Sequence, residues 1–534
     1  MEHDTSMQDR AALLASVSQL CPELELRTDG LDLLATDIFY VAAHRPLAMA
    51  RPATGAQVQA LVVAARRLGL SLAARGAGLS YSAGYIPADA HTIVVDMTAM
   101  DRILEINTED RFVTVEAGVT WETLHAALKP HGLTTPFWGT FSGRHATIGA
   151  SLSQGAKFYG SGHRGTSAES VLGLRVATGT GDILATGSAS GTQSPSPFFR
   201  NYGPDLTGPF LGDCGAFGIK LEATLVLIPA AQAVETCSYS FTDPAALLRT
   251  MGRIGAEMLA TECLAMDPFT ARARMASQGL RADLAVLGQV IRGAGSLPSG
   301  LVDAAQIALH GRRFAGRIGY LMNVIAEGRD RADAASRMRR IRALAAEAGG
   351  TRVPASIPKV MRAMPFGPMN GLLTPSAKRM NWLHVVVPNS RGAACFAATE
   401  AAFAEHADAM RDHGIDRGYL LSAHGPTGVG IETLIRWSDA PLPIHTHYMT
   451  EAERGRLRAR KDNPAARAAV EALSTTIVER WTALGGVHMQ IGRKYPYFQT
   501  RQPATQDFLA ALKRTLDPDG VVNPHNVVPP QTSG

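Results

Sequence analysis

Residues 74–84 form a loop rich in glycine, alanine and serine that follows a short apolar strand, Leu72–Ala74. Gly76 and Gly78 lack a side chain and can adopt positive φ, so consecutive backbone N–H groups can point into one concavity and hold an anion. Further donors to the same anion are offered by the guanidinium of Arg75 and the hydroxyls of Ser80 and Ser82. The loop therefore predicts a pyrophosphate cradle and, with it, a bound dinucleotide.

The loop differs from the two best-known phosphate-binding patterns. Tyr81 stands where a Rossmann G-x-G-x-x-G fingerprint needs its third glycine. No lysine lies between Arg75 and Tyr85, as the loop of a nucleoside-triphosphate site would require. Taken alone, the segment also fits an ordinary glycine- and serine-rich turn, so its assignment depends on the rest of the chain.

Composition narrows the class of protein. The chain has 534 residues, of which 46% are hydrophobic and 19% charged, as in globular enzymes of two or three structural units. A net charge of +5 without a lysine-rich block argues against a nucleic-acid partner. Five scattered cysteines, without C-x-x-C spacing, indicate reduced thiols. We find neither a secretory signal nor an apolar run of roughly 20 residues, so we expect a cytoplasmic location and no membrane span.

Periodicity predicts alternating helices and strands. Apolar residues recur at helical spacing over 54–69, and Thr120 is placed to cap a helix that runs to about Lys129. The other expected elements are a strand over 92–98, hairpins over 103–118 and 171–186, a helix over 329–348, strands over 380–387 and 430–437, and a helix over 504–515. From about residue 235 the chain becomes rich in alanine and arginine, which indicates a second structural unit.

Five further segments follow the loop in a set order. They are Val115–Val119; Thr147–Ser151 with Gly155; Tyr159–Gly165; Pro204–Ile219; and Leu516–Pro524. Together with Arg75–Ser80 and the strand that contains Asp96, they resemble the FAD-binding domain of the vanillyl-alcohol oxidase and p-cresol methylhydroxylase superfamily. The resemblance covers most of the chain and implies an enzyme.

This resemblance implies an α+β fold with a p-cresol methylhydroxylase-type FAD-binding domain of two subdomains and an α+β cap. The expected division is an N-terminal helical segment (1–40), the FAD-binding domain (41–230), the cap (231–470) and a C-terminal segment that completes the FAD-binding domain (471–534). The residues expected to contact FAD are Arg75, Gly76, Ala77, Gly78, Leu79, Ser80, Ser82, Thr147, Gly149, Ala150, Ser153, Gly155, Ile219 and Asn523.

The resemblance leaves the attachment of the flavin open. Some relatives bond the flavin to a histidine of the pyrophosphate loop, and this loop contains none, which favours non-covalent FAD. His145, His163, His424 and Tyr448 stay open as covalent attachment points.

Near the C-terminus, Gly485–Gly492 and the following Tyr495 resemble the D-lactate and glycolate dehydrogenase branch. Met489 stands at that branch's histidine, and His488 lies one position early. The branch's two-histidine metal motif is replaced by a stretch from His424 to Glu432, so we expect no metal. His445 and His447, expected to alternate on a strand, lack a third ligand.

His424, Glu432 and His488 would together suit the removal of a hydroxyl proton while hydride leaves for flavin N5. Alternatively, Glu432 forms an ion pair with Arg436. Arg493 with Tyr495 would suit a carboxylate or, as in the phenol-oxidising branch, a phenolate; an internal ion pair of Arg493 also stays open. The catalytic candidates are thus His488, Glu432, His424, Arg493 and Tyr495.

The leading functional prediction is an FAD-dependent oxidoreductase that takes hydride from a hydroxylated carbon, in a 2-hydroxy acid or in a benzylic or allylic alcohol. The alternative is a para-alkylphenol oxidase or dehydrogenase. A non-redox flavin transferase of the alkyl-dihydroxyacetone-phosphate synthase type is a third class. The expected partners are a small-molecule substrate, an electron acceptor (oxygen, quinone or cytochrome) and, in a homodimer, a second copy of the chain.

Overall fold

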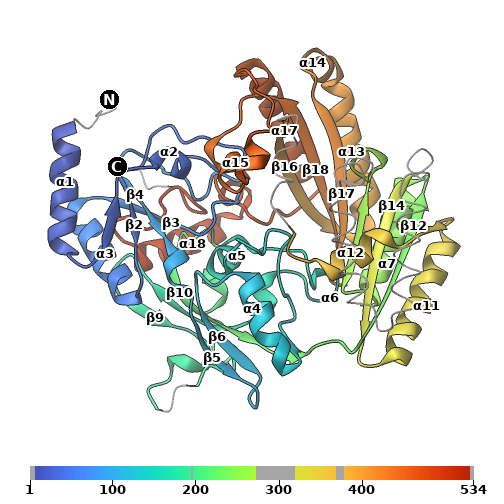
Figure 1. Cartoon of the computed structure of the whole chain (residues 1–534), viewed down its shortest axis with the longest axis horizontal. Helices are drawn as coiled ribbons and strands as arrows, with labels where there is room; N and C mark the ends of the chain where they lie inside the picture. The colour runs from blue at the N-terminus through green and yellow to red at the C-terminus, as the bar shows by residue number, and fades with distance from the viewer. Residues whose placement is uncertain (1–6, 194–195, 272–318, 368–377, 530–534) are drawn as a thin grey trace.

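The computed structural model describes residues 7–193, 196–271, 319–367 and 378–529. Helices and strands form an α+β protein with three main sheets (Figure 1). We refer to residues 41–230 as the N-terminal domain and to 231–470 as the cap, following the division proposed from the sequence. In Figure 1 the N-terminal sheet lies on the left in blue and the cap sheet on the right.

The first sheet carries the glycine-rich loop at the end of one strand. Its strands, in the order β1-β2-β4-β3, are β1 (Glu25–Arg27), β2 (Ala48–Arg51), β4 (Thr92–Asp96) and β3 (Ser71–Arg75). Helix α3 (Gly55–Leu68) packs its apolar residues, such as Leu61, into the core of this sheet. Thr54 caps the helix by accepting a hydrogen bond from the Gln57 N–H, and Gly69 ends it at φ 64°. Helix α1 (Met7–Leu20) precedes the sheet, and α2 (Leu31–Leu34) lies between β1 and β2 in the chain.

The second sheet completes the N-terminal domain. Its strands, in the order β5-β6-β10-β8-β9, are β5 (Ile103–Asn107), β6 (Phe112–Glu116), β10 (Ile219–Val226), β8 (Val171–Ala177) and β9 (Ile183–Ala185). Helices α4 (Trp121–Leu128), α5 (Ile148–Gln154) and α6 (Ser161–Arg164) follow β6, and the pair β7 (Leu133–Thr134) and β11 (Ile228–Pro229) lies beside them. Trp121 and Leu152 are fully buried in the core that these elements share.

The cap is a seven-stranded sheet covered by helices on one face. The strands, in the order β15-β12-β14-β13-β17-β18-β16, are β15 (Thr351–Val353), β12 (Ala233–Phe241), β14 (Tyr320–Gly328), β13 (Glu262–Met266), β17 (Asp416–His424), β18 (Gly428–Ser438) and β16 (Lys378–Pro388). The covering helices are α7 (Pro244–Ala256), α11 (Arg331–Glu347), α13 (Gly392–Glu405) and α17 (Pro464–Ala483); α12 (Ser356–Ala363) and α14 (Ala407–Asp412) are shorter.

Alternation along β18 separates the two faces of the cap sheet. Ile431, Ile435 and Trp437 are buried in the core shared with the helices. Glu432 and Leu434 point to the opposite face, where Leu434 contacts another apolar cluster that includes Phe158 of the N-terminal domain. The polar face of this sheet is therefore turned towards the N-terminal domain.

The C-terminal segment returns to the first sheet. Helix α18 (Pro503–Leu516) is followed by a bridge between Val522 and Leu72 of β3. The Leu72 N–H donates to the Val521 carbonyl, and the Asn523 N–H donates to the Leu72 carbonyl. The chain end therefore supports the strand from which the glycine-rich loop leaves.

The helices and hairpins expected from periodicity are confirmed, with two corrections. The strand expected over 92–98 ends at Asp96, whose carboxylate accepts from the Thr98 N–H and caps a 3-10 helix, Met97–Ala99. The strand expected around His445 is a short helix, α15 (Pro443–His447), because Pro443 supplies the φ of a first helical turn.

All five cysteines are free and buried. In the described ranges, no helix is both long enough and apolar enough to cross a membrane.

Candidate active site

The glycine-rich loop needs both of its first glycines. Gly78 has φ 72°, and a Cβ there would lie 2.1 Å from Nη2 of Arg75. Gly76 keeps a negative φ, yet a Cβ there would lie 2.4 Å from Oγ1 of Thr147 at the start of α5. Positive φ explains one glycine, and close packing on Thr147 and Ala150 explains the other.

The loop also leaves donors free. None of the backbone N–H groups of Ala77–Tyr81 donates a hydrogen bond to another part of the chain that the structure describes. Beside them, the buried hydroxyls of Ser80 and Ser82 lie 3.1 Å apart. A run of unused N–H groups next to two hydroxyls fits the pyrophosphate of a dinucleotide.

The Arg75 guanidinium lies against Gly78 of the loop, but its hydrogen bonds go to carbonyls of the chain and not, as expected, to an anion. The guanidinium is buried and donates to the carbonyls of Leu33, Leu34 and Thr36. Burial lowers the pKa of Arg75. The side chain therefore fixes the N-terminal segment against the loop.

The other expected FAD contacts lie around the loop. The Gly149 N–H donates to the Ala117 carbonyl, and a Cβ on Gly149 would lie 2.6 Å from the Ala117 Cβ, so this residue is small because α5 packs on the chain after β6. Gly155 ends α5 at φ 62°. The Ser153 carbonyl accepts from the Cys214 N–H. The Asn523 amide donates to the carbonyls of Gly84 and Cys214. Leu79 is half-buried, and Ile219 is buried.

A second group of residues lies beside strand β16 of the cap and contains His488 and Tyr495. Their rings stack with centroids 4.1 Å apart and planes 10° apart. His488 Nδ1 lies 2.9 Å from the His384 carbonyl, so it must carry the proton and donate. Nε2 of His488 is then an acceptor; it is buried and has no hydrogen-bond partner among the described residues. Burial lowers the pKa of His488.

His384 completes this group and was missed by the sequence analysis. It lies on β16 directly opposite Glu432 of β18. Its Nδ1 is 3.3 Å from the Tyr495 hydroxyl, and its Nε2 hydrogen-bonds to the Met489 carbonyl. Burial lowers the pKa of His384 well below its ordinary value. A polar residue inside the apolar stretch 380–387 was the signal that could have identified it.

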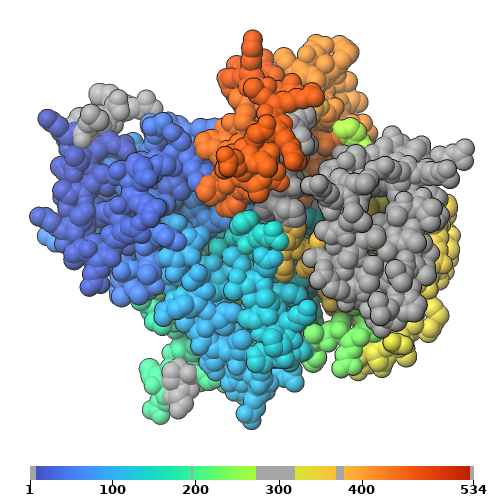
Figure 2. All heavy atoms as spheres, in the orientation of Figure 1, coloured from blue at the N-terminus to red at the C-terminus, as the bar shows by residue number. Residues whose placement is uncertain are grey.

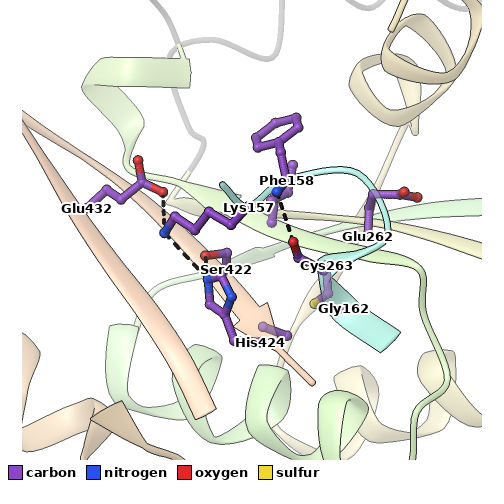
Figure 3. Close-up of a pocket in the computed structure, with 11 residues that line it drawn as sticks. Lys157, Phe158, Gly162, Glu262, Cys263, Ser422, His424 and Glu432 are labelled. Atoms are coloured by element: carbon purple, nitrogen blue, oxygen red, sulfur yellow. Dashed lines mark hydrogen bonds and ion pairs between the residues drawn. The ribbon is translucent and has the colours of Figure 1, made fainter. Parts of the chain in front are cut away.

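Glu432 pairs with Lys157 rather than with Arg436. Lys157 Nζ lies 2.7 Å from Glu432 Oε1 and 3.4 Å from His424 Nε2 (Figure 3). The Ser422 hydroxyl lies 2.9 Å from the same His424 nitrogen. Burial and, next, the Lys157 ammonium lower the pKa of His424 well below its ordinary value. The structure thus brings Glu432 and His424 together through a lysine that the sequence analysis missed.

The N–H donors of Arg493 are already used by backbone carbonyls. Its guanidinium donates to the carbonyls of Ala83, Ile86 and Pro87, which follow the glycine-rich loop. Burial lowers the pKa of Arg493. The residue therefore fixes the loop 83–87, which corrects its expected role in binding a substrate anion.

The segment that contains α15 and α16 (Glu451–Arg454) lies over the glycine-rich loop. The Tyr448 hydroxyl donates to the Ala77 carbonyl, and the Tyr448 ring lies 4.4 Å from that of His145. Figure 2 shows this segment in orange, at the surface between the blue and cyan parts of the N-terminal domain. Two of the open covalent attachment points thus contact each other.

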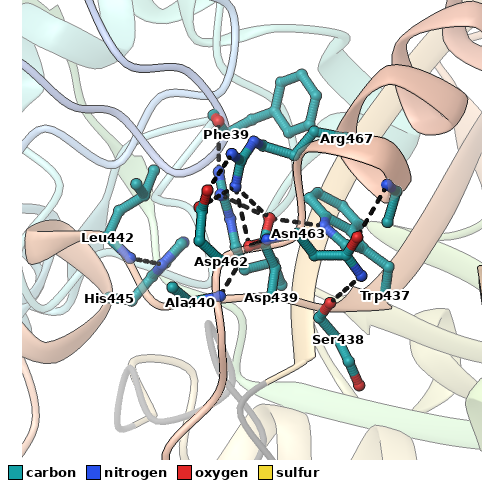
Figure 4. Close-up of polar contacts among 12 residues, drawn as sticks. Phe39, Trp437, Ser438, Asp439, Ala440, Leu442, His445, Asp462, Asn463 and Arg467 are labelled. Carbon is teal, nitrogen blue, oxygen red and sulfur yellow. Dashed lines mark hydrogen bonds and ion pairs between the residues drawn. The ribbon is translucent and has the colours of Figure 1, made fainter.

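A buried charged cluster anchors this segment to the N-terminal part of the chain (Figure 4). Asp439 accepts from Arg379, Arg467 and the Trp437 indole. Arg379 also donates to the Phe39 carbonyl.

The histidines of α15 do not suit a metal. His445 Nδ1 accepts from the Leu442 N–H, and its Nε2 donates to the Ile38 carbonyl, so both ring nitrogens are used. Within the described ranges, no group of three or more His, Cys, Asp or Glu side chains is placed to hold a metal ion.

Comparison with known proteins identifies the cofactor domain. Residues 46–187 match the family described as FAD binding domain. D-2-hydroxyglutarate dehydrogenase of Xanthomonas citri pv. viticola is 30% identical over 217 residues, which are 40% of this chain and 44% of the relative. Glycolate oxidase subunit GlcD of Escherichia coli K12 is 28% identical over 225 residues, 41% of this chain and 43% of the relative. The chain thus spans less than half the length of these curated relatives.

Similarity to solved structures extends over the whole chain. 4-Ethylphenol oxidase from Gulosibacter chungangensis superimposes with a TM-score of 0.70, 16% identity and 99% coverage of both chains. p-Cresol methylhydroxylase gives a TM-score of 0.71, 16% identity and 98% coverage of both. These findings confirm FAD as the cofactor and the p-cresol methylhydroxylase-type α+β fold.

Proposed function

We propose that this FAD-binding protein oxidises a hydroxylated carbon, transferring hydride to FAD, and that its substrate is an uncharged aromatic (benzylic) or allylic alcohol. The observation that carries the proposal is Nε2 of His488, a buried nitrogen beside His384 of the cap sheet that has no hydrogen-bond partner among the described residues. An alcohol loses a hydroxyl proton as it loses hydride, so its oxidation needs such an acceptor.

The surroundings of His488 suit a proton acceptor. The hydrogen bond from Nδ1 to the His384 carbonyl selects the tautomer with a lone pair on Nε2. Stacking on Tyr495 fixes the plane of the ring. Because burial lowers the pKa of His488, the imidazole is neutral at pH 7. The substrate hydroxyl would donate to Nε2 and pass its proton there.

FAD would be held by the free N–H groups of Ala77–Tyr81 and by the hydroxyls of Ser80 and Ser82, and when bound it supplies the hydride acceptor. Non-covalent attachment is favoured because two of the open attachment points already have partners: His424 Nε2 lies against Ser422 and Lys157, and the Tyr448 hydroxyl binds the Ala77 carbonyl. Acid precipitation should therefore release the yellow cofactor into the supernatant.

Two cations of the interface, Arg493 and Lys157, favour an alcohol over a 2-hydroxy acid. A carboxylate is usually held by an arginine or lysine with free donors. Arg493 spends its donors on backbone carbonyls, and Lys157 is paired with Glu432. In contrast, the aromatic rings of Tyr81 and Tyr495 both lie near that of His384, with centroids 6.4 and 5.1 Å away.

A para-alkylphenol is the second candidate, and the same two tyrosines support it. Burial raises the pKa values of Tyr81 and Tyr495, so both stay protonated; Tyr495 donates to His384 Nδ1, and Tyr81 could donate to a phenolate oxygen. Against it stands Arg493, whose guanidinium is turned to backbone carbonyls.

The test is anaerobic reduction of the FAD-loaded protein by a panel of benzylic and allylic alcohols, 2-hydroxy acids and para-alkylphenols, followed by loss of visible flavin absorbance. We expect the alcohols to bleach the flavin fastest. Faster bleaching by the phenols would replace the first candidate with the second, and bleaching by the 2-hydroxy acids alone would overturn the choice of an uncharged substrate.

A further inference from the structure

A narrow pocket lies where the polar face of the cap sheet meets the segment that follows α5. It is lined by Lys157, Phe158, Ser161 and Gly162 from the N-terminal domain and by Glu262, Cys263, Leu264, Ser422, Ala423, His424 and Glu432 from the cap (Figure 3). Lys157 follows Gly155, the last of the residues expected against the flavin in α5, by two positions. The pocket is therefore next to the expected flavin site and, with a volume of about 10 Å³, has room for a single small group such as the hydroxyl of a substrate held between the two units.

One ion pair spans this pocket. Lys157 and Glu432 come from different domains, and their side chains are only 7% and 8% exposed. Nζ lies 2.7 Å from Glu432 Oε1, and its other contact is with His424 Nε2 at 3.4 Å. An ammonium in such a place is stable because a carboxylate faces it; without that partner, it would be an uncompensated buried charge.

The pair also determines how a charged ligand is received. A carboxylate entering the pocket would meet the like charge of Glu432 and would have to compete with it for Lys157. An uncharged hydroxyl meets no such opposition. We propose that the buried Lys157–Glu432 ion pair sets the charge preference of this enzyme: it rejects carboxylate substrates, and Glu432 is the specificity-determining residue. This inference rests on the proposed function, since it places the substrate at this interface.

A substitution that removes only the charge of Glu432 should therefore change which ligands bind. Glu432→Gln keeps the shape of the side chain and removes its charge, so Lys157 becomes a buried cation in need of an anion. A bound carboxylate would then supply the negative charge that residue 432 no longer carries, in a charge-assisted hydrogen bond to Lys157. The variant should gain affinity for carboxylate ligands by at least about tenfold.

Benzoate and benzyl alcohol are matched probes, because they share a ring and differ in charge. Isothermal titration calorimetry on the FAD-loaded protein measures both dissociation constants without turnover. We expect the unmodified protein to bind benzyl alcohol more tightly than benzoate and Glu432→Gln to reverse that order. The double variant Lys157→Met, Glu432→Gln should lose benzoate affinity again. Glu262 also lines the pocket, but its carboxylate accepts from the Gly160 N–H and does not pair with Lys157. Glu262→Gln should therefore not gain benzoate affinity.

Several results would overturn the inference. These are benzoate binding to the unmodified protein as tightly as benzyl alcohol, binding of neither probe, no gain of benzoate affinity in Glu432→Gln, or an equal gain in Glu262→Gln. If Glu432→Gln does not fold, the comparison of the two probes on the unmodified protein still decides. Failure of the proposed function is separate: flavin that no alcohol reduces, with the probe preference intact, would reject the reaction and keep the ion pair as the selector of charge.

Discussion

His488 lies face to face with Tyr495, ring centroids 4.1 Å apart and planes 10° apart, and its Nδ1 donates to the carbonyl of the residue opposite Glu432. Stacking and one hydrogen bond thus fix both the plane and the tautomer of the imidazole. We assign Nε2, the other ring nitrogen of His488, as the acceptor of the substrate proton.

Replacing His488 with asparagine tests that assignment. The amide can still donate to the His384 carbonyl, but it has no basic nitrogen, so flavin reduction should slow by roughly 10²–10⁴-fold, the range typical of a lost general base. FAD content should stay normal. Stopped-flow bleaching gives the rate constant, and His131→Asn, at an exposed position, is the control. Equal rates in the two variants would reject His488 as the acceptor.

The pH profile offers a second view of the same residue. A base works when it is unprotonated, and burial lowers the pKa of His488 below its ordinary value of 6.5. The midpoint of the fall in the rate constant for flavin reduction should therefore lie below pH 6.5. A midpoint above 6.5 would point to another group.

Gly78→Ala should remove most of the bound FAD. The new Cβ would lie 2.1 Å from the Arg75 guanidinium, which three carbonyls hold in place, and it would sit at φ 72°. Gly69→Ala is the matched control, since φ 64° imposes similar strain, about 1–2 kcal/mol, with no atom within 4 Å of the new Cβ. The ratio of flavin to protein absorbance measures the result. Equal FAD content in both variants would disprove the cradle.

Arg493→Lys should lower the thermal unfolding midpoint without changing the affinity for benzoate. The flexible ammonium of lysine cannot serve the carbonyls of Ala83, Ile86 and Pro87 together. Leaving a buried carbonyl unpaired costs about 1–3 kcal/mol, which corresponds to a shift of about 1–3 °C for a chain of this length. Arg144→Lys, in an exposed pair with Glu122, should shift the midpoint little. A change in benzoate affinity without a loss of stability would restore Arg493 to the substrate site.

His445 makes stability depend on pH. Burial lowers its pKa from 6.5 to about 4. Above pH 6.5 the imidazole is neutral in both states; below it, the unfolded chain takes up a proton that the folded protein refuses, so this contribution to stability is lost as pH falls towards 4. The stability advantage of the unmodified protein over His445→Gln should therefore shrink between pH 6.5 and 4, as thermal unfolding would measure. A constant difference would mean that folding does not change the pKa of His445.

Features decided locally were predictable from the sequence. The strand, Gly78 and the following turn are set by the φ that glycine permits, and Thr120 caps α4 as expected by accepting from the Thr123 N–H. The order of several such segments then indicated the superfamily and its cofactor.

Features decided by long-range contacts were not predictable. Arg75 and Arg493 looked like anion binders, but each donates to carbonyls of a segment that only the fold brings near. Lys157 has no distinguishing neighbours in the sequence, and its partner Glu432 lies on a cap strand far along the chain. For Glu432 the strand face was predictable and the partner was not.

The most direct test of the account is the rate of anaerobic flavin bleaching by the best alcohol of the panel, compared with the same alcohol deuterated at the carbinol carbon. If that carbon gives up hydride in the step that reduces FAD, deuterium will slow the bleaching. The account is contradicted if no alcohol bleaches the flavin, or if the unlabelled and deuterated alcohols bleach it at the same rate.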